Sequence, residues 1–173
     1  MRTVPSTVEA AHRDTVRSAD PTELAIHTIA GGYLVQQRDL LGIDEANWKV
    51  VSKRQPTATE MGDLKLAWLA CKHVKSNAIV IAGNSMMYGS GAGQQDRVSA
   101  CRIAIQKAGD RVRGAVAASD AFFPFPDGPQ LLLDAGVTAI IHPGGSVKDK
   151  ETIDLADQRG AAMVLTGQRH FKH

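Results

Sequence analysis

The chain has 173 residues, of which 43% are hydrophobic and 22% charged, so it is long enough for one domain with a hydrophobic core and is neither disordered nor fibrous in composition. Its formal net charge is +2, and its Lys and Arg residues are scattered, which argues against nucleic acid as the main partner. The sequence has no apolar signal segment at its start and no run of about 18 apolar residues, the length that a membrane span requires. We therefore expect a cytoplasmic protein that does not bind membranes.

The amino-terminal 22 residues are polar with mixed charges, and they predict a flexible or helical arm ahead of a single lobe over residues 23–173. In the segment LAIHTIAGGYLVQQRDL, apolar residues alternate on both sides of Gly31 and Gly32. This pattern predicts two strands joined by a tight turn. The segment WKVVSKR predicts a further strand.

A helix is predicted over residues 58–74. Thr57 and Glu60 have the spacing of a capping box, in which each side chain accepts a hydrogen bond from the backbone N–H of the other residue. Apolar residues then recur at helical spacing, at Leu64, Ala67, Trp68 and Cys71.

The rest of the chain alternates short apolar runs with predicted helices. Strands are predicted at 78–82, 114–118, 137–142 and 162–166, and helices follow the first three. Strands that are apolar throughout are buried on both faces, so this alternation predicts a three-layer α/β/α fold with a mixed, mostly parallel sheet. Ligands of such folds collect at the carboxyl ends of the strands.

A glycine-rich segment, GNSMMYGSGAGQQDR, follows the predicted strand at 78–82. Its glycines could let the backbone approach a ligand, with a helix that begins near Gln94 and the side chain of Arg97 both available to a phosphate. The spacing matches neither a P-loop nor a dinucleotide fingerprint. A sharp, tightly packed turn is therefore an equally good interpretation.

The segment ASDAFFPFPDG holds three of the four phenylalanines of the chain. Its prolines stiffen the backbone, and its aromatic rings offer flat surfaces to a planar ligand. Asp127 either caps the next helix or accepts hydrogen bonds from a ring system.

The carboxy-terminal segment RHFKH is either a frayed end or a cationic and aromatic cluster in which His173 could transfer protons at neutral pH. Asn77 either satisfies local backbone groups, which the residues alone favour, or points into a cleft. We interpret Cys71 and Cys101 as buried free thiols, since their spacing is not that of a metal site. The remaining histidines have no partner at motif spacing, and we interpret them as structural or solvated: His12, His27, His73 and His142.

Seven segments together resemble the carboxy-terminal half of the AICAR transformylase domain of the bifunctional AICAR formyltransferase/IMP cyclohydrolase family. They are GGYLVQQRDL, KRQPT, VKSNAIVIA, GAGQQDRV, ASDAFFPFPDG, GVTAIIHPGGSVKD and TGQRHFKH. The resemblance runs from about Leu24 to His173 and implies a cytidine-deaminase-like fold. The family has lost the deaminase zinc site, and this sequence likewise lacks its His-x-Glu and Pro-Cys-x-x-Cys motifs, so no metal is expected.

The resemblance also implies the reaction and the residues that serve it. The family transfers a formyl group from the co-substrate 10-formyltetrahydrofolate to the amine of AICAR, a phosphorylated heterocycle. By resemblance, the catalytic residues would be Asn77, Asp127 and His173. Substrate would be bound by Gly93, Gln94, Arg97, Phe122, Arg169 and Phe171, with the two arginines on the phosphate and the two phenylalanines on the imidazole ring. Folate would contact Val98, Pro124 and Asp127.

The sequence departs from the family pattern in what it lacks. A first transformylase lobe, which carries a Lys-His pair, has no counterpart here, and Lys72-His73 at a predicted helix end is not its equivalent. Gly83 and Ser90 stand where the family pattern has a lysine-like and an isoleucine-like residue.

Three interpretations follow: one subunit of a split formyltransferase, a stand-alone enzyme of secondary metabolism that acts on an AICAR-like ribotide or another heterocycle, or a non-catalytic ribotide-binding lobe or truncation. We expect a homodimer or a heteromer with a first-lobe chain, because a lobe without its neighbour exposes apolar surface.

Overall fold

The computed structural model describes residues 24–37, 39–40 and 42–172. By their contacts these residues fall into two units, with the boundary between Gly42 and Ile43. The arm predicted at residues 1–22 and the role predicted for His173 concern residues outside the described ones. The domain boundary predicted near residue 23 therefore stays a prediction.

The first unit contains the predicted hairpin. Strands β1 (Leu24–Ile29) and β2 (Gly32–Gln37) pair antiparallel, with Ile26 opposite Val35. Gly31 has a φ of +80°, a conformation that glycine adopts without steric cost. One face of the hairpin carries four apolar side chains that are each more than half exposed: Leu24, Ile26, Tyr33 and Val35. An isolated two-stranded hairpin with an exposed apolar face is only marginally stable.

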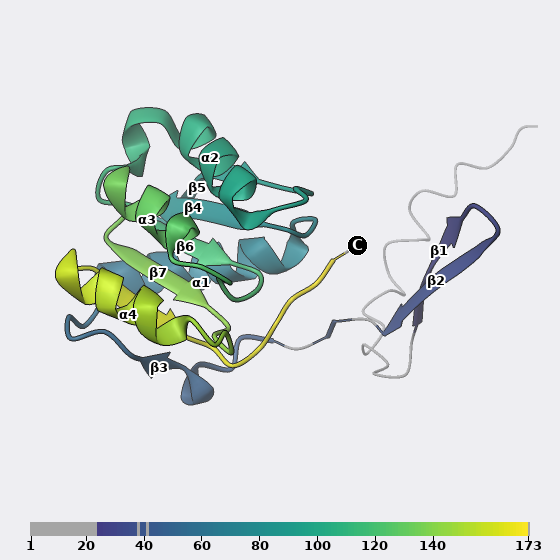
Figure 1. Cartoon of the computed structure of the whole chain (residues 1–173), viewed down its shortest axis with the longest axis horizontal. Helices are drawn as coiled ribbons and strands as arrows, with labels where there is room; N and C mark the ends of the chain where they lie inside the picture. Colours follow the sequence, from purple (N-terminus) through teal and green to yellow (C-terminus); the bar gives the residue numbers. More distant parts are fainter. Residues whose placement is uncertain (1–23, 38, 41, 173) are drawn as a thin grey trace, which may run out of the picture. The chain divides into compact units, whose positions relative to one another are not determined.

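The second unit is built on a six-stranded mixed sheet with the order β3-β8-β7-β6-β4-β5 (Figure 1). The strands are β3 (Lys49–Val50), β4 (Ile79–Gly83), β5 (Met86–Gly91), β6 (Val116–Ser119), β7 (Ala139–His142) and β8 (Ala162–Leu165). Only β6–β7 and β7–β8 are parallel pairs, while β3–β8, β4–β6 and β4–β5 are antiparallel. The prediction of a mostly parallel sheet is therefore wrong. The apolar run of β4 reports burial on both faces, and a central antiparallel strand in a covered sheet has the same pattern.

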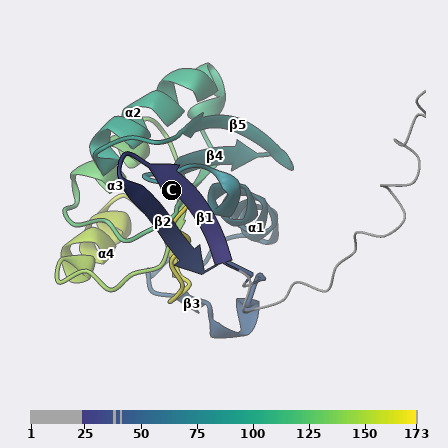
Figure 2. The ribbon, with the colours of Figure 1, turned by 90° about the vertical axis from the view of Figure 1, so that its right-hand side faces the viewer.

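Helices cover both faces of this sheet, which confirms the predicted α/β/α layering. Helix α1 (Ala58–His73) lies on one face, and α2 (Arg97–Ala108), α3 (Asp127–Asp134) and α4 (Asp149–Gln158) lie on the other (Figures 1 and 2). Two short 3-10 helices, η1 (Glu45–Asn47) and η2 (Gly109–Val112), lie in the connections.

The predicted capping box at the start of α1 is confirmed. Thr57 Oγ1 accepts a hydrogen bond from the Glu60 N–H at 3.1 Å, and Glu60 Oε2 accepts one from the Thr57 N–H at 2.8 Å. The predicted apolar face of α1, including Trp68 and Cys71, packs on the even-numbered side chains of β4, Val80 and Ala82. Local sequence therefore sets both the start of this helix and its buried face.

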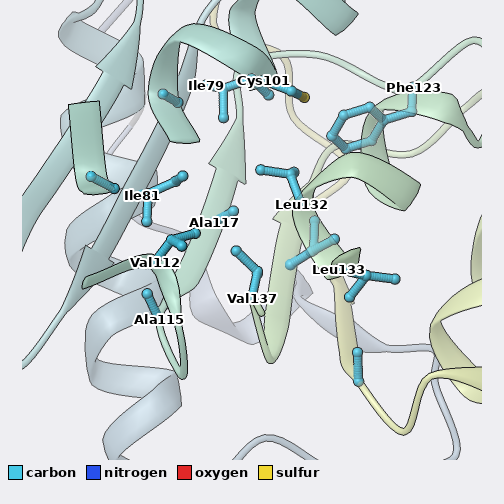
Figure 3. Close-up of a cluster of buried hydrophobic side chains, with 14 of the residues drawn as sticks. Ile79, Ile81, Cys101, Val112, Ala115, Ala117, Phe123, Leu132, Leu133 and Val137 are labelled. Atoms are coloured by element: carbon cyan, nitrogen blue, oxygen red, sulfur yellow. The ribbon is translucent and has the colours of Figure 1, made fainter. Parts of the chain in front are cut away.

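The opposite face of the sheet holds the second core cluster (Figure 3). Ile79 and Ile81 of β4 point into it, together with Cys101, Phe123 and Leu132. Both cysteines are free and buried, as predicted. Burial raises the pKa of the Cys101 thiol to about 12 and that of the Cys71 thiol well above its usual value, so neither is a nucleophile at neutral pH.

Residues 86–91 of the glycine-rich segment form a strand. After a turn at Asn84 and Ser85, whose φ angles are +50° and +58°, it forms β5. A Cβ on Gly89 would lie 2.4 Å from the backbone oxygen of Ala104, and a Cβ on Gly91 would lie 2.0 Å from that of Ala100. These two glycines therefore let α2 pack directly on β5, which supports the tightly packed interpretation for this part of the segment.

Candidate functional site

The direction of β4 brings distant segments to one edge of the sheet. Because β4 runs antiparallel to β6, Ile79 pairs with Ser119, and the start of β4 lies beside the end of β6. Strand β5 then runs back along β4, and Gly91 also pairs with Ile79. Asn77, the 93–97 segment and the residues after β6 therefore gather at the carboxyl end of β6.

Arg97 is the centre of a buried polar network at this edge. Its side chain is only 8% exposed and forms an ion pair with Asp120, which is 0% exposed. Its Nη1 also donates to Ser119 Oγ at 2.9 Å, and its Nη2 donates to Asn77 Oδ1 at 2.8 Å. The guanidinium that resemblance assigns to a ligand phosphate thus has three side-chain partners within the protein, and its Nη1 also lies 3.5 Å from the Ala78 oxygen.

Asp120 is the residue of this network that the sequence analysis did not single out. Its backbone N–H donates to the Ala78 oxygen at 3.3 Å, and its own backbone oxygen accepts from the His170 N–H at 3.0 Å. Its Oδ2 is buried and has no hydrogen-bond partner among the described residues. The available signal is a charged residue two positions after the apolar run at 114–118, where its burial requires a counter-charge.

Asn77 holds the backbone that leads into α2. Its Nδ2 donates to the Gln94 oxygen at 3.0 Å and to the Gln95 oxygen at 3.2 Å, and its backbone N–H donates to the Gln94 oxygen at 3.2 Å. Gly93, with a φ of +65°, donates its N–H to the Lys75 oxygen. These contacts match the backbone role that the residues alone favoured for Asn77, while its catalytic role stays a prediction.

The aromatic segment and the carboxy-terminal segment meet at the same edge. The guanidinium carbon of Arg169 lies 5.1 Å from the centroid of the Phe122 ring, within the range of a cation–π contact. Arg169 Nη2 also lies 4.0 Å from the position that a Cβ on Gly145 would occupy. A side chain there would approach the arginine, so the glycine leaves this side of Arg169 open.

Residues 168–172 are anchored and not frayed. The His170 ring is 2% exposed and packs on the Trp68 ring at a centroid distance of 4.8 Å. Further along, the Lys172 N–H donates to Ser76 Oγ at 3.1 Å, and the Ser76 N–H donates to the Lys172 oxygen at 2.9 Å. Phe171 is 37% exposed at this edge.

Of the residues assigned by resemblance to the folate side, Asp127 begins α3 and Pro124 lies three residues before it. Pro124 is exposed, and Asp127 accepts a hydrogen bond from the Gly128 N–H at 2.8 Å, within the first turn of its own helix. Beside it is a hollow of about 370 Å³. Its wall consists of Phe125, Pro126, Asp127, Gln130, Glu151, Leu155 and Gln158. Arg97, Phe122 and Arg169 do not line this hollow, and Val98 lies half-buried on α2.

The HPGGS segment after β7 has its backbone donors occupied. Gly145 and Ser146 donate their N–H groups to Asp149 Oδ2 at 2.6 and 3.2 Å, and Gly144 donates to His142 Nδ1 at 3.1 Å. Burial lowers the pKa of His142 to about 3, with a smaller contribution from the charge of Arg97. His142 is therefore neutral and buried, which matches the structural one of the two roles, structural or solvated, predicted for it.

Among the described residues, no group of three or more His, Cys, Asp or Glu side chains is placed to hold a metal ion. Within the same residues, no helix is both long and apolar enough to span a bilayer.

Comparison with known proteins identifies the family of this chain. The family model described as AICARFT/IMPCHase bienzyme matches residues 10–107. The chain belongs to the AICARFT/IMPCHase bienzyme family. Bifunctional purine biosynthesis protein PurH of Halalkalibacterium halodurans is 55% identical over 151 residues, which are 87% of this chain and 30% of that protein. The PurH proteins of Anoxybacillus flavithermus and Bacillus thuringiensis are 56% and 49% identical, over 84% and 91% of this chain and 29% and 31% of their own lengths.

The chain therefore spans about a third of the length of the PurH relatives that it matches. Among solved structures, form 2 of RibD from Acinetobacter baumannii is similar, with a TM-score of 0.44 and 15% identity over 62% of this chain and 34% of that chain. This similarity is too low to assign a fold, so the cytidine-deaminase-like architecture stays a prediction.

Proposed function

We propose that this chain supplies one half of a formyl-transfer site, in which a one-carbon group passes from 10-formyltetrahydrofolate to the amine of AICAR or an AICAR-like ribotide. Membership of the AICARFT/IMPCHase bienzyme family supports the chemistry. The observation that carries the proposal is the gathering of Asn77, Arg97, Phe122 and Arg169 at one edge of the sheet. A cytoplasmic location forms part of this proposal.

Arg169 is the best-placed group for the ribotide phosphate. Its guanidinium is held over the Phe122 ring and forms no ion pair with the residues that the structure describes, so its N–H donors remain available for a bidentate contact. The Phe122 ring, with Phe171, would face the heterocycle. Arg97 would act on the ligand mainly through Asn77, because its own guanidinium is bound to Asp120.

The part of the proposed site that the first lobe carries is not in this sequence. The chain covers about a third of its PurH relatives, and the sequence contains no counterpart of the first-lobe Lys-His pair. We therefore propose that it works with a first-lobe chain, or as a homodimer that completes the cleft. The exposed apolar face of the β1–β2 hairpin is surface that such an association would cover.

One experiment separates this proposal from its alternatives. The purified chain is assayed for formyl transfer from 10-formyltetrahydrofolate to AICAR, alone and with the remaining part of a PurH relative added as a separate chain. Turnover only in the mixture supports a split site, and turnover by the chain alone supports a stand-alone enzyme. Tight ribotide binding without turnover in either case supports a non-catalytic lobe. The absence of both ribotide binding and turnover would reject the proposal. Removal of His173 should then lower turnover without weakening ribotide binding.

A further inference from the structure

A second polar hollow lies at the opposite edge of the sheet from Asn77 and Asp120. It has a volume of about 470 Å³, within the size range of small-molecule sites. Its wall includes Thr57 at the start of α1, Asn84 in the β4–β5 turn and Arg111 in η2. Strands β6 and β7 begin beside it, so the length of these strands separates it from the proposed formyl-transfer site at their carboxyl ends.

The two acidic residues that line this hollow already have internal partners. Glu60 accepts two hydrogen bonds of 2.8 Å from Arg54, in addition to its part in the capping box. Asp63 is buried and accepts from the backbone N–H groups of Asn84 and Ser85, at 3.1 and 2.7 Å. The charge of Glu60 is therefore balanced by Arg54, whereas both oxygens of Asp63 are held by the β4–β5 turn.

The two arginines that line the hollow, Arg111 and Arg113, form no ion pair with the described residues. The Arg111 guanidinium lies 4.9 Å from the centroid of the Tyr88 ring, and its Nη2 reaches the Tyr88 backbone oxygen only at 3.5 Å. Arg113 is exposed, and its backbone N–H donates to the Asp110 oxygen at 3.4 Å, but its guanidinium has neither a hydrogen bond nor an ion pair among the described residues. Neither of these two guanidinium groups forms an ion pair with a carboxylate of the described residues, although the charge of Asp63 lines the same hollow.

We propose that this hollow binds inorganic phosphate or a phosphate monoester, with Arg111 and Arg113 as its principal ligands. A guanidinium presents its N–H donors in a fork that matches phosphate oxygens. The hydroxyls of Thr57 and Thr59 in the same wall are further donors. This site is separate from the proposed formyl-transfer site and does not depend on it.

The surroundings of Tyr88 favour recognition of the phosphate over recognition of an aromatic base. A Cβ on Gly83 would lie 2.7 Å from the Tyr88 ring, and Arg111 lies over the ring as well. Little ring surface is left for a base to stack on. Inorganic phosphate and a nucleoside monophosphate should therefore bind with similar affinity.

Isothermal titration calorimetry with the full chain at constant ionic strength tests this site. The titrations use the Arg169→Gln background, so that the edge containing Asn77 does not contribute a phosphate contact, and the probes are inorganic phosphate, AMP and adenosine. Phosphate and AMP should bind and adenosine should not. Arg113→Gln should weaken phosphate binding about tenfold, the usual scale for a charged hydrogen bond. Arg102→Gln, an exposed arginine outside the hollow, is the matched control and should leave the affinity unchanged.

Three results would overturn the proposal: no binding of phosphate, equal binding by Arg113→Gln and the control, or binding of adenosine as tight as that of AMP. Arg111→Gln should add a further loss, measured only if its thermal unfolding matches that of the parent. Arg113→Gln removes no side-chain hydrogen bond or ion pair of the described structure, so it decides the test even if Arg111→Gln fails to fold.

Discussion

The guanidinium of Arg169 lies over the ring of Phe122, with 5.1 Å between the guanidinium carbon and the ring centroid. These residues are far apart in sequence, and their contact joins the carboxy-terminal segment to the segment after β6. The contact depends on the anchoring of His170, whose backbone N–H donates to the Asp120 oxygen and whose ring packs on Trp68. A cation and a flat ring are thereby fixed side by side at one edge of the sheet.

Replacement of Arg169 tests the phosphate role. We expect Arg169→Ala to weaken binding of a phosphorylated ligand by about 1.5 to 3 kcal/mol, the range for a hydrogen bond to a charged group. Calorimetry with AICAR ribotide and with its dephosphorylated nucleoside measures the difference, in the presence of a first-lobe chain if binding requires one. Equal losses for the two compounds would show that Arg169 does not contact the phosphate.

The buried ion pair of Arg97 and Asp120 should matter for stability. Arg97→Gln leaves the Asp120 carboxylate buried without its counter-charge, and we expect the free energy of unfolding to fall by about 3 to 5 kcal/mol. Urea denaturation measures it, with the exposed Arg102→Gln as control, expected within about 0.5 kcal/mol of the parent. The double variant Arg97→Gln/Asp120→Asn should lose less than the sum of the two single losses, and strict additivity would argue against a direct coupling.

Two glycines give opposite predictions for the same substitution. Gly91→Ala places a Cβ 2.0 Å from the Ala100 oxygen, a clash with helix backbone, and should cost about 3 kcal/mol or more. Gly62→Ala lies on the exposed side of α1, where a Cβ meets no atom within 4 Å, and should stabilise by about 0.5 to 1 kcal/mol. Thermal or urea unfolding compares the two variants. A tolerated Gly91→Ala would contradict the close approach of α2 to β5.

The pH dependence of stability should reflect the protonation of His142. Its pKa falls from the ordinary value of 6.5 to about 3 in the folded chain, chiefly because it is buried. Between these values the unfolded chain binds a proton that the folded chain does not, so stability is lost as the pH falls through this window. From pH 7 to 5 the loss should be about 2 kcal/mol.

The variant His142→Gln supplies the control for this pH effect. It removes the titrating group and should flatten the decline between pH 7 and 5, whatever its effect on stability at pH 7. Urea midpoints at several pH values compare the two proteins. An equal decline in both would assign the pH dependence to other groups.

The amino-acid sequence by itself determined the local structure of this protein. The capping box of Thr57 and Glu60 fixes the start of α1 because both groups that it satisfies lie within four residues of each other. The apolar runs fix which segments are buried strands, and the hairpin at Gly31 follows from alternation on both sides of a turn residue. Each of these features depends on neighbours in the sequence.

Only the tertiary structure decided the direction of β4 and the surroundings of Arg97. An apolar run reports that both faces of a strand are covered, but its backbone hydrogen bonds can be satisfied in either direction. Because β4 is antiparallel to β6, the segment before β4 lies beside the segment after β6, where the Asp120 N–H donates to the Ala78 oxygen, and the turn at the other end of β4 lies at the opposite edge. The burial of Arg97 likewise depends on Asp120, 23 residues away, whose counter-charge no local pattern specifies.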